Sequence, residues 1–393
     1  MEFFATTAKG MEELLAAELT EIFRVGSTAF PELAEAQVGK PTRAGVPFSG
    51  PIIAAYRACL WSRTANRILV PLKTFPAPDP EKLYGGVKSI RWSDHLEPSK
   101  TIAVDFACTH SQITHSQFGA QKTKDAICDQ LRSVAGERPS VDLVNPDLRI
   151  NVYVRNDEAT VSIDLSGSSL HARGYREEQQ AAPMKENLAA AVLLLSGYAE
   201  IAKAGGALVD PMCGSGTLPL EAAMIATNTA PGLGRKRWGF FGWKKHQAEL
   251  WTKLKRDADS VRILDVKKLP KIVGFDEDAR AIHTALANLE TAGMRGLVHF
   301  EKRELDLAEP PAGATTGLFI VNPPYGERLG DEESLKPVYR RIGDAMKKRF
   351  KGWKGGVFTG SQPLSKEVGL KAARRHVLFN GAIECRLLTY DLY

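Results

Sequence analysis

Short apolar runs alternate with helix-like repeats through the second half of the chain. The runs cover residues 207–209, 271–275, 297–301 and 318–321, and stretches with the period of an amphipathic helix separate them. This alternation is typical of parallel strands joined by crossover helices. We therefore expect an α/β domain with a doubly wound sheet.

The N-terminal half has a different pattern. Leu14, Leu15, Leu19 and Ile22 repeat at helical spacing. Residues 101–108 and 148–154 alternate like half-buried strands, and a basic helix over 117–132 lies between them. These short elements indicate a small α+β module.

The C-terminal pattern closes the domain. An apolar stripe of residues 338, 342, 346 and 350 predicts a helix, and residues 356–360 predict a strand. Residues 377–390 predict a hairpin around Asn380-Gly381, because Asn-Gly favours a tight turn. The polar segments 166–169 and 173–180 resemble a linker, and we place a domain boundary near Gly167.

Polar residues and glycines suited to ligand binding follow the ends of the apolar runs. Asp210 ends the first run, a glycine-rich turn follows, and a helix is expected to open at Thr217. Strand, turn and helix in this order form a nucleotide-binding turn, although the GxGxxG spacing of dinucleotide sites is absent. The Asp210 carboxylate could take the ammonium of an amino-acid-like ligand, while glycines admit the ligand to the backbone.

Acids and an amide follow the later runs. Asp276 stands where a carboxylate can accept both ribose hydroxyls of a nucleoside. Asp306 could receive an adenine amino group, with Glu304 as the rival for that role. The run 318–321 delivers Asn322 to the same edge of the sheet.

Two motifs carry a family resemblance. Asp-Pro-Met-Cys-Gly-Ser-Gly-Thr (210–217) with the later Asn-Pro-Pro-Tyr (322–325) resembles the class I S-adenosylmethionine-dependent methyltransferases that act on exocyclic amines. The longer NPPYGERL (322–329), with FATTAKGMEELLAAEL and SQFGAQKTKDAICD in the N-terminal half, is similar to THUMP-domain methyltransferases that make N2-methylguanine in 23S ribosomal RNA.

The resemblance implies an architecture. A ferredoxin-like part (1–50) and a THUMP RNA-binding domain (51–165) would precede a Rossmann-like methyltransferase domain (166–393) with strand order 3-2-1-4-5-7-6. The implied cofactor is S-adenosyl-L-methionine. Its expected contacts are Asp210, Pro211, Cys213, Gly214, Ser215, Gly216, Thr217, Asp276, Asp306 and Asn322, with Lys185 and Glu186 at the start of a helix that opens near Pro183.

The expected catalytic residues are Asn322, Pro323, Pro324 and Tyr325. The Asn322 side-chain oxygen and the Pro323 carbonyl would accept both hydrogens of the target amine and aim its nitrogen at the methyl group. Tyr325 would stack on the extruded base. This chemistry requires no metal.

RNA contacts are expected in two places. In the THUMP part the candidates are Ser116, Gln117, Lys122, Lys124 and Arg149. An insertion over 230–256 interleaves cations with aromatic rings, including Arg237, Trp238 and Trp243. The rings could stack on RNA bases, or they could pack the insertion onto the fold while the charges stay solvated.

Composition narrows the class of protein. The 393 residues carry a net charge of +6, and residues 1–165 hold 18 Lys and Arg against 20 Asp and Glu, so the excess lies in the remainder. The five cysteines are scattered without a CxxC pair, which argues against disulfides and zinc. We see no signal peptide or membrane span and expect a cytoplasmic protein.

Other functions stay open at this level. The same motifs would suit a transfer-RNA guanine-N2 methyltransferase, a DNA adenine methyltransferase, or an inactive RNA-binding or ribosome-assembly protein. A nucleotide-dependent oxidoreductase is disfavoured by the missing GxGxxG. Some members of the resembled family continue into a second methyltransferase domain, whereas this sequence stops at Tyr393, so only the first activity is expected.

Overall fold

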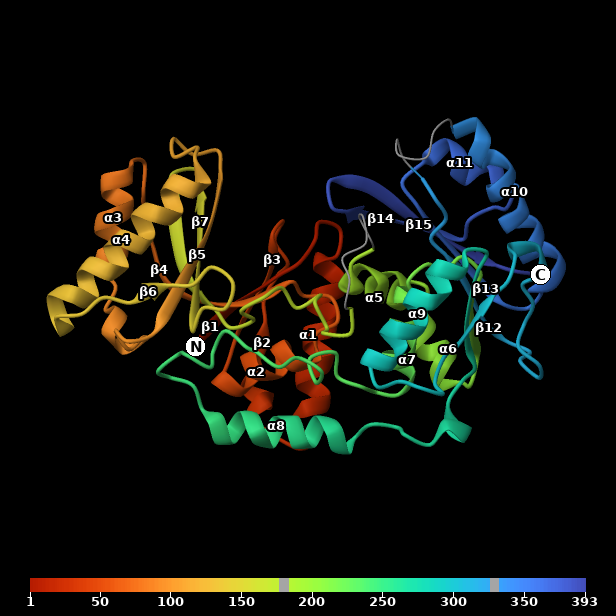
Figure 1. The fold of residues 1–393 in the computed structure, drawn as a ribbon, viewed down its shortest axis with the longest axis horizontal. Helices are drawn as coiled ribbons and strands as arrows, with labels where there is room; N and C mark the ends of the chain where they lie inside the picture. The colour runs from red at the N-terminus through yellow and green to blue at the C-terminus, as the bar shows by residue number, and fades with distance from the viewer. Residues whose placement is uncertain (177–183, 326–331) are drawn as a thin grey trace. The chain divides into compact units, whose positions relative to one another are not determined.

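The computed structural model describes residues 1–176, 184–325 and 332–393, in two compact units (Figure 1). The first unit comprises Met1–Thr7, Leu15–Leu170 and Arg235–Arg256. The second unit comprises Ala8–Leu14, His171–Gly234 and Asp257–Tyr393. Each unit therefore contains a segment that the chain order alone would give to the other. Within the described ranges, no helix combines the length and apolar character needed to cross a membrane.

The first unit is built on one mixed sheet. Its eight strands lie in the order β2-β3-β1-β4-β8-β7-β5-β6. The strands are β1 (Glu2–Thr6), β2 (Gln37–Val38), β3 (Gly45–Ser49), β4 (Arg67–Pro76), β5 (Thr101–Thr109), β6 (Ser140–Val141), β7 (Leu148–Arg155) and β8 (Glu158–Asp164). Strand β4 pairs with β1 on one side and with β8 on the other, so one sheet joins the N-terminal part to the THUMP-like part.

The helices of the first unit lie between these strands. They are η1 (Pro31–Glu35), α2 (Ile52–Trp61), α3 (Pro80–Lys88), η2 (Trp92–Asp94) and α4 (Ser116–Ala135), while α1 (Glu12–Gly26) and α8 (Ala248–Ser260) each have residues in both units. The expected basic helix over 117–132 is α4, and Gly136 in the left-handed conformation ends it.

The insertion packs into the first unit through its rings. Phe240 lies 4.7 Å from the Tyr56 ring and 4.9 Å from Trp251, measured between ring centroids. The side chains of Trp238 and Trp243 are 5% and 3% exposed. This burial favours the alternative that the rings pack the insertion onto the fold over stacking on RNA bases. Burial of aromatic surface holds the insertion in place.

The second unit contains a seven-stranded sheet in the order β11-β10-β9-β12-β13-β15-β14. Numbered along the chain within the sheet, this is 3-2-1-4-5-7-6, the order that the resemblance implied. The strands are β9 (Ala207–Asp210), β10 (Ile272–Asp276), β11 (His299–Lys302), β12 (Gly317–Val321), β13 (Lys354–Thr359), β14 (Arg374–Asn380) and β15 (Ile383–Asp391). Only β15 runs antiparallel to both of its neighbours.

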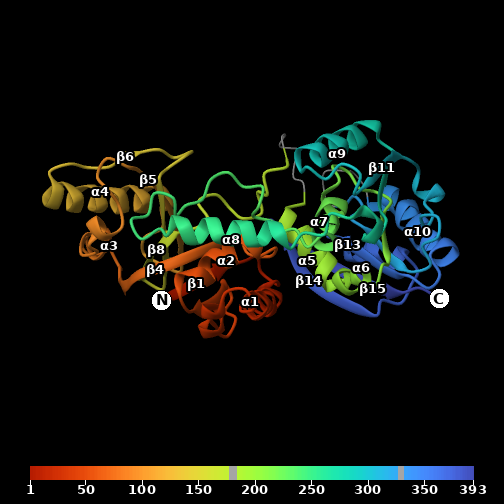
Figure 2. The same cartoon turned by 90° about the horizontal axis from the view of Figure 1, so that it is seen from below.

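Helices cover both faces of this sheet (Figure 2). They are α5 (Glu186–Leu195), α6 (Tyr198–Lys203), α7 (Thr217–Ala226), η3 (Val266–Lys268), α9 (Ala279–Thr291), η4 (Leu305–Leu307), α10 (Glu332–Arg349) and α11 (Gln362–Glu367). Leu208 and Ile320 point into a core with α5, α6, α7 and α9. Val209 and Val321 point to the other face, where α10 and α11 pack. Alternate residues of one strand thus serve two cores, as the uninterrupted apolar runs require.

Some expected boundaries shift. The expected strand 297–301 is β11, which begins two residues later. In the hairpin, Asn380 pairs with Ile383, so Gly381 and Ala382 form the turn and Asn380 belongs to the strand. The helix expected to open near Pro183 is α5, which begins at Glu186. Pro183 itself and the Gly326–Leu329 part of the longer motif lie outside the described residues.

Candidate functional site

Three strands that carry expected site residues end at one edge of the second sheet. Strands β9, β10 and β12 are parallel neighbours, so Asp210, Asp276 and Asn322 meet at their carboxyl ends. This is the edge at which parallel sheets of this kind bind ligands. The structure thus brings together the residues expected from the two separate motifs.

The turn after β9 is shaped for close approach to its backbone. Gly214 and Gly216 have φ angles of +54° and +80°, which other residues adopt rarely. A Cβ at Gly216 would come within 2.6 Å of the Phe300 ring, whereas a Cβ at Gly214 would meet no heavy atom within 4 Å. The space next to Gly214 is therefore open, whereas Gly216 is packed against the Phe300 ring.

Asp276 ties the turn to the next strand. One of its carboxylate oxygens accepts the Gly214 N–H at 2.9 Å, and the other accepts the Asp278 N–H at 3.0 Å. Each oxygen retains a free lone pair, because a carboxylate offers about four acceptor positions. The half-buried Asp276 can accept two further hydroxyl hydrogens, as a ribose diol would supply.

Asp210 is a buried acid with little compensation. Its side chain is 1% exposed and accepts the Met212 N–H at 3.2 Å. Burial raises the pKa of the Asp210 carboxyl well above its ordinary value, and the charge of Asp276 adds to the shift. A cationic ligand group beside Asp210 would reverse this penalty.

The remaining turn residues support its shape. Pro211, Ser215 and Thr217 are buried, and the Asn288 side chain donates to the Ser215 carbonyl at 3.0 Å. Burial raises the pKa of the Cys213 thiol, which fits a packing residue and not a nucleophile.

The other expected cofactor residues have different surroundings. Asp306 is exposed and forms a 2.8 Å ion pair with Arg341, while Glu304 precedes η4. Lys185 is exposed before α5.

Glu186 belongs to a buried charge cluster. Its carboxylate lies 3.0 Å from His171 Nδ1 and 3.7 Å from the Arg176 guanidinium. Burial opposes ionisation of Glu186, but the hydrogen bond with His171 and the charge of Arg176 hold its pKa below the ordinary value. Arg176 also donates to the Thr217 hydroxyl at 2.7 Å. Sequence reasoning missed this link between the polar segment after the first unit and the first turn of α7.

Asn322 follows β12 with an unused acceptor. Its Oδ1 is buried, and none of the described residues donates a hydrogen bond to it. A buried polar atom without a partner costs about 1–3 kcal/mol, so native proteins rarely keep one without a function. The Asn322 amide is therefore poised to accept a hydrogen from a ligand.

The residues after Asn322 are held by α10 and the last hairpin. The Tyr339 hydroxyl lies 3.2 Å from the Pro324 carbonyl and 2.6 Å from the Thr359 hydroxyl. The Tyr325 hydroxyl accepts the Asn380 side-chain N–H at 3.1 Å. Pro323 is buried beside them. None of these supporting contacts was predicted, because they join residues 15 to 55 positions apart.

The Tyr325 ring has a defined position. It meets the Phe358 ring edge to face, with centroids 6.4 Å apart. The Cys385 thiol lies 3.5 Å from the Tyr325 hydroxyl, and a Cβ at Gly360 would come within 2.5 Å of the ring. The ring therefore stays in place only because residue 360 is a glycine.

The candidate RNA residues of the first unit are mostly in ion pairs. Lys122 lies 3.8 Å from Glu81 and Lys124 lies 2.6 Å from Asp125. Arg149 bonds to Asp105 at 2.9 Å. The other three candidates are exposed: Ser116 and Gln117 at the start of α4, and Arg237, which donates to the Asn145 carbonyl at 3.2 Å.

Comparisons with known proteins cover most of the chain. Residues 173–389 match the family described as "RMKL-like, methyltransferase domain". Residues 77–164 match the THUMP domain, and residues 2–69 match the RlmL ferredoxin-like domain.

Individual relatives are similar over the full length of this chain. The ribosomal RNA large subunit methyltransferase K/L of Methylococcus capsulatus is 50% identical over 391 residues, which cover 100% of this chain and 51% of that protein. The protein of the same name from Syntrophotalea carbinolica is 46% identical, with 100% of this chain and 54% of that protein covered. The chain thus spans about half the length of the curated relatives it matches.

A solved structure extends the comparison to three dimensions. The crystal structure of SMU.472 complexed with SAH has a TM-score of 0.85 and 30% sequence identity with this chain. The match covers 100% of this chain and 98% of that one. The two folds are therefore alike in both units.

Proposed function

The chain belongs to the RMKL-like methyltransferase family, and on that premise we propose that it transfers a methyl group from S-adenosylmethionine to the N2 amine of a guanine in large-subunit ribosomal RNA. The names of the relatives support the choice of ribosomal RNA. The cytoplasm, where ribosomal RNA is assembled into subunits, would be the place of this reaction.

One observation carries the proposal: at the end of β12, the Oδ1 of Asn322 is buried and accepts no hydrogen bond from any residue that the structure describes. The substrate that suits it is a donor of hydrogen bonds, and an exocyclic amine has two N–H groups to donate. The amine nitrogen is a weak nucleophile because its lone pair is delocalised into the ring. Acceptance of an amine hydrogen by Asn322 returns electron density to nitrogen and orients its lone pair.

The residues at the edge of the sheet fit the methyl donor. S-adenosylmethionine would supply a methyl group bound to a sulfonium. The neutral amine would attack the methyl carbon while the carbon–sulfur bond breaks and S-adenosylhomocysteine leaves, and the methylated nitrogen would then release a proton to solvent. Asp276 would hold the ribose hydroxyls with its remaining lone pairs, and Asp210 would take the ammonium of the methionine part. The open space above Gly214 leaves room for the donor along the turn.

Tyr325 and the prolines would hold the target base. Tyr339 bonds to the Pro324 carbonyl, so the loop backbone is fixed and the Pro323 carbonyl can serve as the second acceptor. Tyr325, held by Asn380, would stack on the base. We assign RNA capture to the first unit, whose residues 2–69 and 77–164 match the ferredoxin-like and THUMP domains, and methyl transfer to the domain that residues 173–389 match.

The test is direct transfer of labelled methyl groups to 23S ribosomal RNA from cells that lack the protein. Digestion to nucleosides and mass spectrometry should give N2-methylguanosine. N6-methyladenosine would move the proposal to another exocyclic amine, and absence of any methylated nucleoside would overturn it. Transfer RNA serves as the competing substrate in a parallel reaction.

A further inference from the structure

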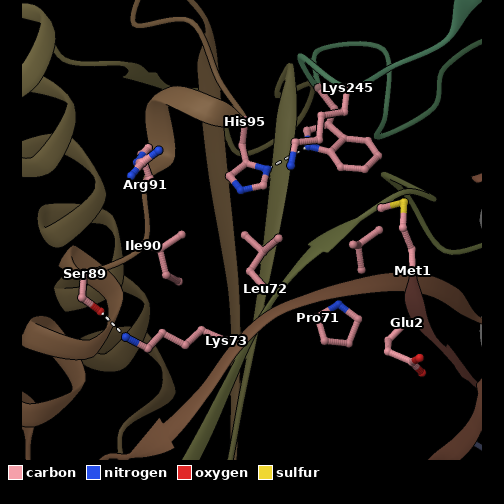
Figure 3. A pocket seen from close by; sticks show the side chains of 12 residues that line it. Met1, Glu2, Pro71, Leu72, Lys73, Ser89, Ile90, Arg91, His95 and Lys245 are labelled. Atoms are coloured by element: carbon pink, nitrogen blue, oxygen red, sulfur yellow. Dashed lines mark hydrogen bonds between the residues drawn. The ribbon is translucent and has the colours of Figure 1, made fainter. Parts of the chain in front are cut away.

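The first unit contains a cavity that no part of the methyl-transfer chemistry uses. Its volume is about 520 Å³, and it lies beside β4 (Figure 3). Its lining comes from β4, from the segment after α3, from the chain start and from the insertion. Leu72 and Ile90 form part of its wall, and Figure 3 shows polar side chains such as Lys73 and His95 around them.

The charged residues of the lining are mostly positive. They are Lys73, Arg91 and Lys245, with Glu2 as the acid among them. Lys73 Nζ donates to the Ser89 hydroxyl at 2.7 Å, and no described carboxylate pairs with Lys73 or Lys245. Arg91 has only a 3.8 Å contact with Asp94. In contrast to Lys122, Lys124 and Arg149, two of these cations are therefore not neutralised by a neighbour.

His95 supplies a fixed donor within the cavity. The Trp243 indole N–H donates to His95 Nδ1 at 3.1 Å, so the proton of the neutral imidazole must sit on Nε2. Among the described residues, no acceptor lies opposite that Nε2–H, although the side chain is only 9% exposed. Figure 3 shows the His95 imidazole among the lining residues.

The chemistry of the lining selects an anion with several acceptor oxygens. Burial lowers the pKa of His95 to about 4, so near neutral pH the ring donates a hydrogen bond without adding charge. The lysines supply the charge and remain exposed to solvent. A phosphate group satisfies both, since its oxygens accept hydrogen bonds and its charge attracts lysine.

We propose that this cavity binds a backbone phosphodiester of the RNA substrate, with His95, Lys73 and Lys245 as its contacts. The inference rests on the proposed function, since it takes RNA as the substrate. It also gives the insertion a role in RNA binding, through Lys245 and through the contact of Trp243 with His95, and not through stacking of its rings on bases. The ring of Trp243 fixes the tautomer of His95, and the charge of Lys245 meets the phosphate.

The test compares two charge-matched double variants of the full chain. Lys73→Glu with Lys245→Glu changes the cavity, and Lys40→Glu with Lys255→Glu changes exposed lysines of the same unit that do not line it. Binding of a 23S ribosomal RNA fragment is measured by filter retention over a salt series. We expect the cavity variant to bind at least about tenfold more weakly and the slope of log K against log salt to fall by about 1.

The control variant should bind within about threefold of the wild type. Equal losses in both variants would overturn the subsite, since they would show only a general effect of net charge. Unchanged RNA binding by the cavity variant would overturn it too, even if the cavity bound inorganic phosphate. Since RNA binding is measured without a methyl donor, failure of the subsite is distinct from failure of the proposed methyl transfer.

A second pair of variants tests the donor. His95→Gln keeps an N–H group, whereas His95→Leu removes it. RNA affinity should be near wild type for glutamine and about fivefold weaker for leucine, the scale of one hydrogen bond. Thermal unfolding of both variants serves as the check on folding. Equal affinity of the two, at equal stability, would remove His95 from the subsite.

Discussion

Two polar groups at the sheet edge are poorly compensated in the free protein. Within the described ranges, no group donates a hydrogen bond to Asn322 Oδ1, and the buried Asp210 carboxyl accepts one backbone N–H. Each destabilises the fold until a ligand supplies a hydrogen or a cation. Binding sites commonly hold such groups, because the interaction that stabilises the complex is missing from the free protein.

Replacement of Asn322 should affect the rate more than binding. Asn322→Ala removes the acceptor of the amine hydrogen and should lower the methylation rate by about a hundredfold or more. Asn322→Asp keeps an acceptor oxygen and should retain more activity than alanine. Single-turnover methylation measures the rate, and calorimetry with SAH should show unchanged donor affinity. Wild-type turnover by the alanine variant would reduce the Asn-Pro-Pro-Tyr segment to a turn.

Replacement of Asp210 should separate stability from binding. The folded-state pKa is raised, so the folded protein holds a proton that the unfolded chain releases, and wild-type stability falls as pH rises toward that pKa. Asp210→Asn has no such titration and should be more stable at pH 8, by on the order of 1–3 kcal/mol. Its advantage should shrink toward pH 4.

Urea unfolding at the two pH values measures this difference. The same variant should bind S-adenosylmethionine at least about tenfold more weakly, because it cannot pair with the ammonium. The burial penalty assigned to Asp210 predicts that the stability difference between Asp210→Asn and the wild type is larger at pH 8 than at pH 4. A difference that is smaller at pH 8 would contradict it.

At the scale of elements, the hairpin β14–β15 does more than close the sheet. Asn380 and Cys385 both reach the Tyr325 hydroxyl, and Phe358 of β13 meets its ring. Burial raises the pKa of the Tyr325 hydroxyl, which stays protonated. The position of the proposed base-stacking ring is therefore set by strands that come last in the chain.

A double-mutant cycle tests this arrangement. Tyr325→Phe and Asn380→Ala should each lower the methylation rate about tenfold, since each removes the same hydrogen bond. The double variant should be no slower than Tyr325→Phe, because that substitution already removes the hydroxyl that Asn380 contacts. Val377→Ala, on an exposed side chain of β14, serves as the control. Additive losses in the cycle would mean that Asn380 acts elsewhere.

The sequence predicts elements better than it predicts contacts between them. Asp210, Asp276 and Asn322 could be placed together because parallel strands end at one edge. The role of Asn380 could not, because Asn-Gly favours a turn whatever its side chain contacts. The burial of Trp238 and Trp243 depends on Tyr56 and His95, more than 140 positions away, and local composition cannot reveal such partners.

At the scale of the whole molecule, each unit includes a short segment from the part of the sequence that otherwise forms the other unit: Arg235–Arg256 in the first and Ala8–Leu14 in the second. Met11 has no exposed surface and belongs to the core of the second unit. Next to it, Lys9 lies over the Phe379 ring at 4.4 Å, and a Cβ at Gly10 would come within 2.3 Å of the Val377 carbonyl. The segment Ala8–Leu14 is thus packed against the hairpin that holds Tyr325.

Truncation of Met11 should destabilise the second unit despite its place near the chain start. Met11→Ala should lower the free energy of unfolding by about 2–5 kcal/mol, the usual range for a cavity in a core. Val25 lies on α1, which begins one residue after Met11, and is half exposed, so Val25→Ala should change the free energy of unfolding by no more than about 0.5 kcal/mol. Urea denaturation measures the free energy of unfolding with and without SAH. A loss that SAH binding partly offsets lies in the second unit, which contains the proposed donor site. Equal effects of the two substitutions would contradict the assignment of Met11.

The exchanged segments also constrain how the protein is made. A nascent chain that has reached Leu170 still lacks Trp238, Phe240, Trp243 and Trp251, which complete the apolar interior around Tyr56. By the time the ribosome adds them, β9 and α7 have already been synthesised. The first unit therefore cannot be completed before Arg256 is synthesised, when part of the second unit has already left the ribosome. No single crossover point in the gene could transplant either unit intact.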